Sequence, residues 1–263
     1  MRGTLATIAL SLFGCATATP PPPCNPGLPL VNATLYMQTA AEYQAAARQT
    51  YAAARIALDR ELASPAAQPP AIILDLDETV LDNSRYAVRS IERGATFQFD
   101  EHWTEWVSES ASSAIPGAAE FLNYAVSRGV TPFYITNRTA DMETPTRRNL
   151  EQLGIPLGAG EDSVLVRGER PEWNTTDKTS RRDFVAAHYN VLLMFGDDLN
   201  DFTSVSGKSV AERNAVIAQT GANWGSRWFI VPNAIYYSWE SAVTGSTGTP
   251  CEQLQKKLDY LQP

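Results

Sequence analysis

The sequence predicts an α/β fold with a parallel β-sheet and a smaller, mainly helical part. Alternation of strands and helices favours a parallel sheet, and continuous apolar strands are typical of a sheet buried on both faces. Four short apolar runs have the length of buried strands: 71–75, 131–136, 191–197 and 227–232. Four helix-like stretches lie between or beside them: 117–128, 141–153, 178–189 and 208–220. Ligands of such sheets bind where the strands end.

Composition excludes several classes of protein. The chain has 263 residues, of which 44% are hydrophobic and 19% charged, so it is an ordinary globular sequence. Its net charge of −8 makes it a poor binder of nucleic-acid polymers, whose backbones require Lys and Arg. The only histidines are His102 and His188, which excludes a three-His zinc site. Three cysteines are too few for a Cys₄ zinc site.

The N-terminus has the pattern of an export signal. Residues 1–14 combine one positive charge with an apolar run that is too short to span a bilayer, which predicts a signal peptide. The run ends in Leu12-Phe-Gly-Cys15, which resembles a bacterial lipobox. This resemblance implies lipid attachment at Cys15, and Ala16 after it favours the outer membrane. The alternative is an ordinary signal peptide with an incidental cysteine.

Residues 15–30 form the predicted lipidated tether, which includes a stiff polyproline spacer. Export would place the chain in an oxidising compartment. If Cys15 carries lipid, Cys24 and Cys251 remain as a pair. They either form a disulfide between the tether and the last helix or stay as two free thiols, and the sequence leaves both alternatives open.

The rest of the chain divides into three predicted parts. Residues 31–66 carry small and aromatic side chains at steps of three and four, which predicts one or two amphipathic helices. Residues 67–245 form the core, and 246–263 a C-terminal helix. Within the core, 83–115 is too long for a simple connection. This insertion is rich in aromatic residues, and we expect it to fold over the strand ends as a partial lid.

Two aspartates follow the first predicted strand. Asp75 and Asp77 are two residues apart, so on a continuing strand their side chains point to the same side. Close carboxylates in a cleft push each other's pKa values apart. One can then stay ionised as a nucleophile while the other serves as general acid and base.

A second acidic group follows another predicted strand, at Asp197, Asp198 and Asp201. Because the carboxyl ends of parallel strands meet at one edge, we expect these residues to lie near Asp75 and Asp77. So many carboxylates together require a cation, and oxygen ligands of this kind suit Mg²⁺. The metal would also allow an acidic site to accept an anionic substrate.

Four motifs in this order resemble those of the haloacid dehalogenase (HAD) superfamily of phosphatases. They contain Asp75, Thr136, Lys178 and Asp197. With the lipobox, the segments 82–86, 103–106 and 232–236 resemble the class C acid phosphatases, bacterial outer-membrane lipoproteins with 5′-nucleotidase activity. This resemblance implies a Rossmann-like HAD core with a parallel sheet plus a smaller helical domain or lid.

The resemblance also implies roles for the acidic residues. Asp75 would attack phosphorus and form an aspartyl-phosphate, while Asp77 would act as general acid and then as general base. Mg²⁺ would be bound by the Asp75 side chain, the Asp77 backbone carbonyl and Asp197. Asp201 would support the metal from the same turn.

Other residues would then bind the substrate. Thr136, with backbone N–H groups near Asn137, would bind the phosphoryl oxygens, and Lys178 would neutralise their charge; a solvated lysine at a helix start is the alternative. The resemblance further implies that Tyr86, Trp103 and Tyr236 contact a nucleobase, and core packing is the alternative for each.

We therefore expect a Mg²⁺-dependent acid phosphatase, anchored to the membrane by lipid, that hydrolyses phosphomonoesters such as nucleoside monophosphates. One alternative is a phosphomonoesterase or phosphotransferase without nucleotide preference. The other is a noncatalytic surface-binding lipoprotein. The sequence leaves open whether the chain forms a homodimer.

Overall fold

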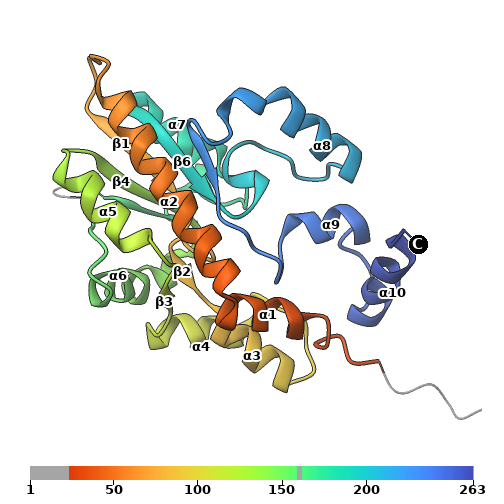
Figure 1. The fold of residues 1–263 in the computed structure, drawn as a ribbon. Coiled ribbons are helices and arrows are strands. Elements are labelled where there is room, and N and C mark those ends of the chain that lie inside the picture. The colour runs from red at the N-terminus through yellow and green to blue at the C-terminus, as the bar shows by residue number, and fades with distance from the viewer. Residues whose placement is uncertain (1–23, 159–161, 263) are drawn as a thin grey trace, which may run out of the picture.

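The computed structural model describes residues 24–158 and 162–262, so the predicted signal peptide and Cys15 lie outside the described residues. A five-stranded sheet lies at the centre of the molecule (Figure 1). All its pairings are parallel, in the order β5-β4-β1-β6-β7. The strands are β1 (Pro70–Leu74), β4 (Thr131–Thr139), β5 (Val164–Arg167), β6 (Asn190–Gly196) and β7 (Trp228–Ile230). The predicted α/β class with a parallel sheet is confirmed.

One strand of the central sheet was missed by the sequence analysis. The edge strand β5 is only four residues long, and Val164, Leu165 and Val166 in it are fully buried. Its short apolar run is a weaker signal than those of the other strands. The order in which strands are added to the sheet reverses between β1 and β6, since β4 and β5 lie on one side of β1 and β6 and β7 on the other. This switch point opens a crevice at the carboxyl ends of β1 and β6, the usual place for a ligand in such sheets.

Helices cover both faces of the sheet. The first face carries α2 (Ala41–Leu62) and α5 (Ala118–Ser127), which pack on Ile72 and Leu74. Figure 1 shows α2 running across this face. On the other face, α7 (Thr179–His188) packs on Ile73. Neighbouring residues of β1 thus point to opposite faces and are buried on both, which explains the continuous apolar pattern.

The aromatic and alanine stripe predicted for 31–66 lies on two helices, α1 (Leu30–Thr39) and α2. Its central members are buried: Tyr43, Ala47, Tyr51, Ala54 and Leu58. Tyr51 stacks on Phe195 of β6, with ring centroids 5.6 Å apart, and its hydroxyl donates to the Thr79 carbonyl at 2.7 Å. Helix α2 therefore supports the loop that follows β1.

The predicted insertion 83–115 contains two helices and one strand of a small two-stranded antiparallel sheet. Its elements are α3 (Ser84–Glu92), α4 (Glu101–Glu109) and β3 (Ser113–Ala114), which pairs antiparallel with β2 (Leu81–Asp82). A separate aromatic cluster joins α1, α3 and α4 to Tyr236. Beyond it, α6 (Glu143–Gln152) follows β4 through a short 3₁₀ turn, η1 (Ala140–Met142).

The C-terminal part contains α8 (Val210–Gln219), α9 (Ser238–Thr244) and α10 (Pro250–Tyr260), which lie to one side of the sheet (Figure 1). Neither α8 nor α10 has a fully buried side chain. A disulfide joins Cys24 to Cys251 at the start of α10, which decides between the two alternatives left open by the sequence. Among the described residues, no helix is both long enough and apolar enough to cross a membrane.

Candidate active site

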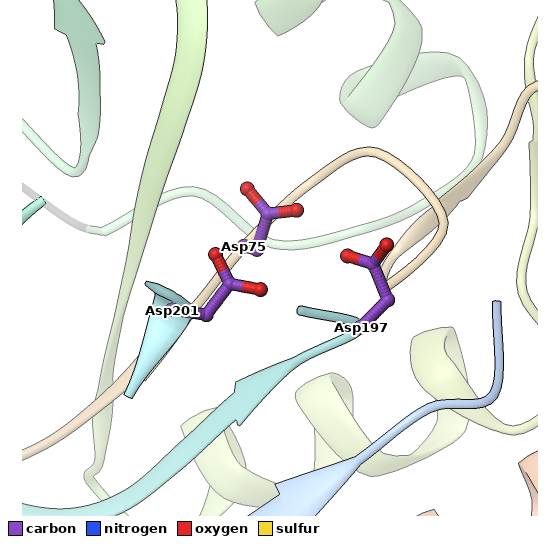
Figure 2. Close-up of side chains that lie close together, drawn as sticks. All are labelled: Asp75, Asp197 and Asp201. Carbon is purple, nitrogen blue, oxygen red and sulfur yellow. The ribbon is translucent and has the colours of Figure 1, made fainter. Parts of the chain in front are cut away.

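Three carboxylates converge at the carboxyl edge of the sheet. Asp75 follows β1, Asp197 follows β6, and Asp201 lies in the short 3₁₀ turn η3 (Leu199–Asp201). Each offers an oxygen within 4.8 Å of those of the other two, and all three side chains are buried. Figure 2 shows the three carboxylates around a common space. The predicted meeting of the two acidic groups at one edge is confirmed for these residues.

Glycine makes this convergence possible. A Cβ atom on Gly196 would lie 2.3 Å from Cβ of Asp201, a separation that real side chains do not tolerate. Oδ2 of Asp201 accepts the backbone N–H of Asp198 at 2.9 Å, and the Asp198 carboxylate in turn caps the 3₁₀ turn. The turn therefore folds back onto the end of β6 and directs Asp201 toward Asp75.

Lys178 is the cation of this group. Its ammonium donates to Oδ1 of Asp201 at 2.7 Å and also bonds Oδ1 of Asp75, and its side chain is 2% exposed. The alternative of a solvated helix-start lysine is therefore wrong. Burial by itself lowers the pKa of Lys178, but Asp201 and Asp75 outweigh it and raise the pKa above its usual value.

Lys178 pairs with two of the three buried carboxylates, those of Asp75 and Asp201. Burial is the largest cause that raises the pKa of Asp75, to about 7, with Lys178 opposing and Asp201 adding to the rise. The pKa values of Asp197 and Asp201 are raised for the same leading reason. The Asp197 carboxylate has neutral partners, Thr79 at 3.1 Å and Asn233 at 2.8 Å. A further positive charge would thus stabilise the ionised group.

One oxygen at the centre has no partner. Oδ2 of Asp75 is buried and makes no hydrogen bond among the described residues. A buried polar atom of this kind is rare without a functional reason. It fits either a cation or the electrophilic centre of a substrate, and the carboxylates of Asp197 and Asp201 lie close to it. The donor set, carboxylate oxygens only, is one that hard divalent cations prefer.

Asp77 lies apart from the three-carboxylate group. It lines the adjacent cavity and its carboxylate forms a buried ion pair with Arg138, at 2.7 Å. The sequence analysis expected Asp75 and Asp77 to push each other's pKa values apart. That expectation was incomplete, because Lys178 and Asp201 change the pKa of Asp75 more than Asp77 does. The sequence analysis gave Arg138 no role.

Thr136 and Asn137 lie near the end of β4, beside the same edge. The buried Thr136 hydroxyl oxygen accepts the Arg138 N–H at 3.1 Å, which leaves its own proton free to donate. Arg181, also buried, bonds the Thr136 carbonyl and donates to Oδ1 of Asn137 at 2.8 Å. Arg181 thus fixes the segment that precedes the strand end, a contribution that no local sequence signal indicated.

A cavity of about 1040 Å³ opens beside the carboxylates, with Asp77, Asn137 and Asp201 in its wall. Five aromatic residues also line it: Phe97, Phe99, Trp103, Tyr236 and Tyr237. The insertion contributes the first three, so it covers the strand ends as expected of a partial lid. Phe99 was not assigned a role from the sequence.

The three aromatic residues predicted to contact substrate differ in position. Trp103 and Tyr236 line the cavity but are only 2% and 4% exposed. Tyr86 is fully buried behind them, and its hydroxyl donates to the Gln98 carbonyl at 2.6 Å, so the structure does not bring it into the cavity wall. Phe99, in contrast, is 59% exposed.

Tyr236 also reaches the loop that follows β1. Its hydroxyl bonds Oε2 of Glu78, a fully buried residue with a positive φ of 61°. Oε1 of Glu78 accepts the Asn83 N–H at 2.8 Å. Burial is the largest cause that raises the pKa of Glu78 well above its usual value. The contact therefore connects the cavity wall to the loop carrying Asp77.

A five-stranded parallel sheet with Asp75 and Asp77 after its central strand is typical of an HAD-type α/β fold, and Thr136 and Lys178 lie at the same carboxyl edge. The family model described as "HAD superfamily, subfamily IIIB (Acid phosphatase)" matches residues 25–239. The chain therefore belongs to this family of acid phosphatases, which are phosphomonoester hydrolases.

Solved structures agree with this assignment. The class C acid phosphatase from Bacillus anthracis is 34% identical, with a TM-score of 0.84 over 91% of this chain and 99% of that one. A second structure of a class C acid phosphatase from that organism, with tungstate bound, is 35% identical, with a TM-score of 0.83 over 90% and 99%. The stem 28 kDa glycoprotein of Glycine max is 25% identical over 171 residues, which span 63% of this chain and 59% of the glycoprotein.

Proposed function

We propose that the protein is a Mg²⁺-dependent acid phosphatase that hydrolyses phosphomonoesters through a phosphorylated Asp75. The unpartnered Oδ2 of Asp75 carries this proposal. It is a buried carboxylate oxygen that nothing else in the described chain uses, at the edge where a sheet of this type binds its ligand. Lys178 holds the other oxygen of the same carboxylate.

The residues that would hold Mg²⁺ are Asp75, Asp197 and the backbone carbonyl of Asp77, with Asp201 in support. Asp201 suits a supporting role because its two oxygens already accept hydrogen bonds from Lys178 and from the Asp198 N–H. When bound, the ion would neutralise negative charge on the phosphoryl group. The excess of three carboxylates over one ammonium is the feature of this site that favours a divalent cation.

The chain's own residues would carry both chemical steps. In the first, Asp75 forms a bond to phosphorus while the bond from phosphorus to the alcohol oxygen breaks, and Asp77 gives that oxygen a proton. In the second, Asp77 takes a proton from water, whose oxygen bonds phosphorus as the bond to Asp75 breaks. Inorganic phosphate leaves and both carboxyl groups return to their starting states.

Fixed donors would stabilise the transferred group. Thr136 would donate its free hydroxyl proton to a phosphoryl oxygen, assisted by backbone N–H groups near Asn137. Lys178 would offset charge on the phosphoryl group and on Asp75. Because these groups are buried and already oriented, they act in a medium where such electrostatic stabilisation is strong.

Phosphate release from an aryl phosphate, with and without Mg²⁺, tests the mechanism. We expect activity to vanish with a chelator and return with Mg²⁺, and Asp75→Asn to be inactive in both cases. The exposed Asp183 of α7 offers a matched control, Asp183→Asn, which should behave like the wild type. Metal-independent turnover, or an active Asp75→Asn variant, would overturn the proposal.

We also propose a preference for nucleoside monophosphates. The cavity is large enough for a group beyond the phosphate, and flat aromatic rings stack on nucleobases with little base preference. Phe99 supports this because its ring is exposed at the cavity. The alternative, a phosphatase without nucleotide preference, predicts similar kcat/KM for adenosine monophosphate, a sugar phosphate and an aryl phosphate.

Finally, we propose export and attachment to the bacterial outer membrane through lipid on Cys15. The Cys24–Cys251 disulfide supports export, because such bonds persist in oxidising compartments. Membrane fractionation of the wild type and Cys15→Ser is the test. Equal release of both proteins into the soluble fraction would contradict the lipid anchor.

A further inference from the structure

Arg138 binds the carboxylate of Asp77 with two of its nitrogens. Nη2 donates to Oδ1 at 2.7 Å, while Nε lies 3.1 Å from Oδ1 and 3.2 Å from Oδ2. The Arg138 side chain is 1% exposed and that of Asp77 is 10% exposed. Sixty-one positions separate the two residues, and they meet because β1 and β4 are neighbours in the sheet.

The guanidinium group is itself fixed in place. Its third nitrogen, Nη1, donates to the hydroxyl of Thr146 at 3.0 Å, and that hydroxyl donates to the Met142 carbonyl at 2.7 Å. The guanidinium carbon lies 5.5 Å from the centre of the Trp103 ring, within range of a cation–π contact. Arg138 is therefore held between α6 and the lid.

Asn83 holds Asp77 from a second direction. Its Nδ2 donates to Oδ1 of Asp77 at 2.9 Å. The amide orientation is set because Oδ1 of Asn83 accepts from Trp106 at 2.9 Å and from Ser112 at 2.7 Å. Oδ1 of Asp77 thus accepts three hydrogen bonds, whereas within the described part of the chain Oδ2 has only the longer contact with Nε of Arg138.

We propose that Arg138 is a positioning residue for proton transfer by Asp77. By occupying Oδ1, it leaves Oδ2 as the oxygen that carries the proton and fixes the direction of that oxygen at the cavity wall. The proton passes from Oδ2 to the alcohol oxygen as the bond between phosphorus and that oxygen breaks, and Asp77 becomes a carboxylate paired with Arg138. The inference rests on the proposed role of Asp77 as general acid.

Leaving groups of different basicity test this role. Nitrophenolate leaves without a proton, whereas an alkoxide needs one. We therefore expect Arg138→Met to lower kcat/KM for an alkyl phosphate by about 10²–10⁴-fold, the usual size of general-acid catalysis, and for p-nitrophenyl phosphate far less. This ratio reports the steps up to release of the alcohol, which excludes later hydrolysis of phosphorylated Asp75 from the comparison.

Two further variants make the result decisive. Arg138→Lys should recover part of the loss on the alkyl phosphate, and it carries the test if Arg138→Met does not fold. The control is Arg128→Met, which removes an exposed arginine that also pairs with a carboxylate, Asp59, and lies over an aromatic ring, Tyr124. It should leave both substrates unaffected.

The outcomes separate the inference from the proposed function. If Asp77→Asn shows the leaving-group dependence but neither Arg138 variant does, the positioning role of Arg138 is wrong while the proposed function stands. An equal loss on both substrates in the Arg138 variants also overturns the role. If Asp77→Asn shows no such dependence, Asp77 is not the general acid, and the proposed mechanism fails together with the inference.

Discussion

Lys178 donates a 2.7 Å hydrogen bond to Oδ1 of Asp201, and both side chains are 2% exposed. Lys178→Met keeps most of the length of the side chain but leaves Asp201 and Asp75 buried without a cation. Breaking a buried ion pair costs about 3–5 kcal/mol, so we expect the metal-free variant to unfold at lower denaturant concentration. Loss of transition-state charge stabilisation should lower kcat by about 10²–10³-fold. Lys257→Met, in a partly exposed pair with Glu240, is the control and should change neither.

The stability of the metal-free protein should fall as pH rises from 5 to 8. Burial raises the folded-state pKa of Asp75 to about 7, and those of Asp197 and Asp201 are also raised, whereas all three are near 4 when unfolded. In this window the folded state binds more protons than the unfolded state, so the free energy of unfolding decreases with pH. Thermal unfolding across this range is the measurement, with Asp75→Asn expected to flatten the slope.

Added Mg²⁺ should raise the melting temperature more at pH 8 than at pH 5, because ionised carboxylates bind the cation and it binds only the folded site. A melting temperature that rises with pH without metal, or a Mg²⁺ effect independent of pH, would contradict this account of the three carboxylates.

Gly196→Ala should damage the metal site. The added Cβ would lie 2.3 Å from Cβ of Asp201, so η3 has to move away from β6. Overpacking of this kind costs about 1–3 kcal/mol, and displacement of Asp201 should weaken Mg²⁺ binding and slow turnover. Gly221→Ala is a matched control, because nothing lies within 4 Å of its added Cβ. Mg²⁺ titrations of activity on both variants decide the matter, and identical curves would show that Asp201 needs no such close approach.

Phe99→Ala should reduce the preference for nucleotides. A stacked base contributes about 1–3 kcal/mol, so kcat/KM for adenosine monophosphate should fall roughly tenfold or more while that for a small sugar phosphate stays nearly unchanged. Trp103→Ala is the comparison, because Trp103 is almost fully buried and packs edge-on against Phe99 at 5.1 Å. If the substrate ratio is unchanged in both variants, base stacking is not the source of any preference.

Reduction of the Cys24–Cys251 disulfide should release the C-terminal helix. Because α10 has no fully buried side chain, the bridge is a main restraint on its position. We expect rapid proteolysis of 250–262 after reduction and a loss of stability of about 2–4 kcal/mol, with the activity of the sheet edge retained. Mass spectrometry after alkylation is the check on the bond itself, since labelling of both cysteines before reduction would show that it does not form.

The sequence alone determined the class of fold and most of its elements. Strand and helix patterns repeat within a few residues, so local spacing is sufficient to find β1, β4, β6 and β7 and the helices between them. The same local patterns place Asp75 and Asp197 at the ends of strands, and a parallel sheet brings such strand ends together at one edge. The short edge strand β5 was missed because its apolar run is no longer than those found in loops.

Tertiary structure decided the contacts between distant segments. The pairing of Asp77 with Arg138 depends on the order of β1 and β4 in the sheet, and that of Lys178 with both Asp75 and Asp201 on how α7 and η3 approach the same edge. The tertiary structure also decided that the Phe99 ring is exposed at the cavity and that Tyr86 is buried. These contacts and exposures depend on how whole helices and strands pack, and the types and spacing of neighbouring residues do not determine that packing. Sequence therefore identified the candidate reacting groups, and the fold decided which oxygen of each is held and which is free.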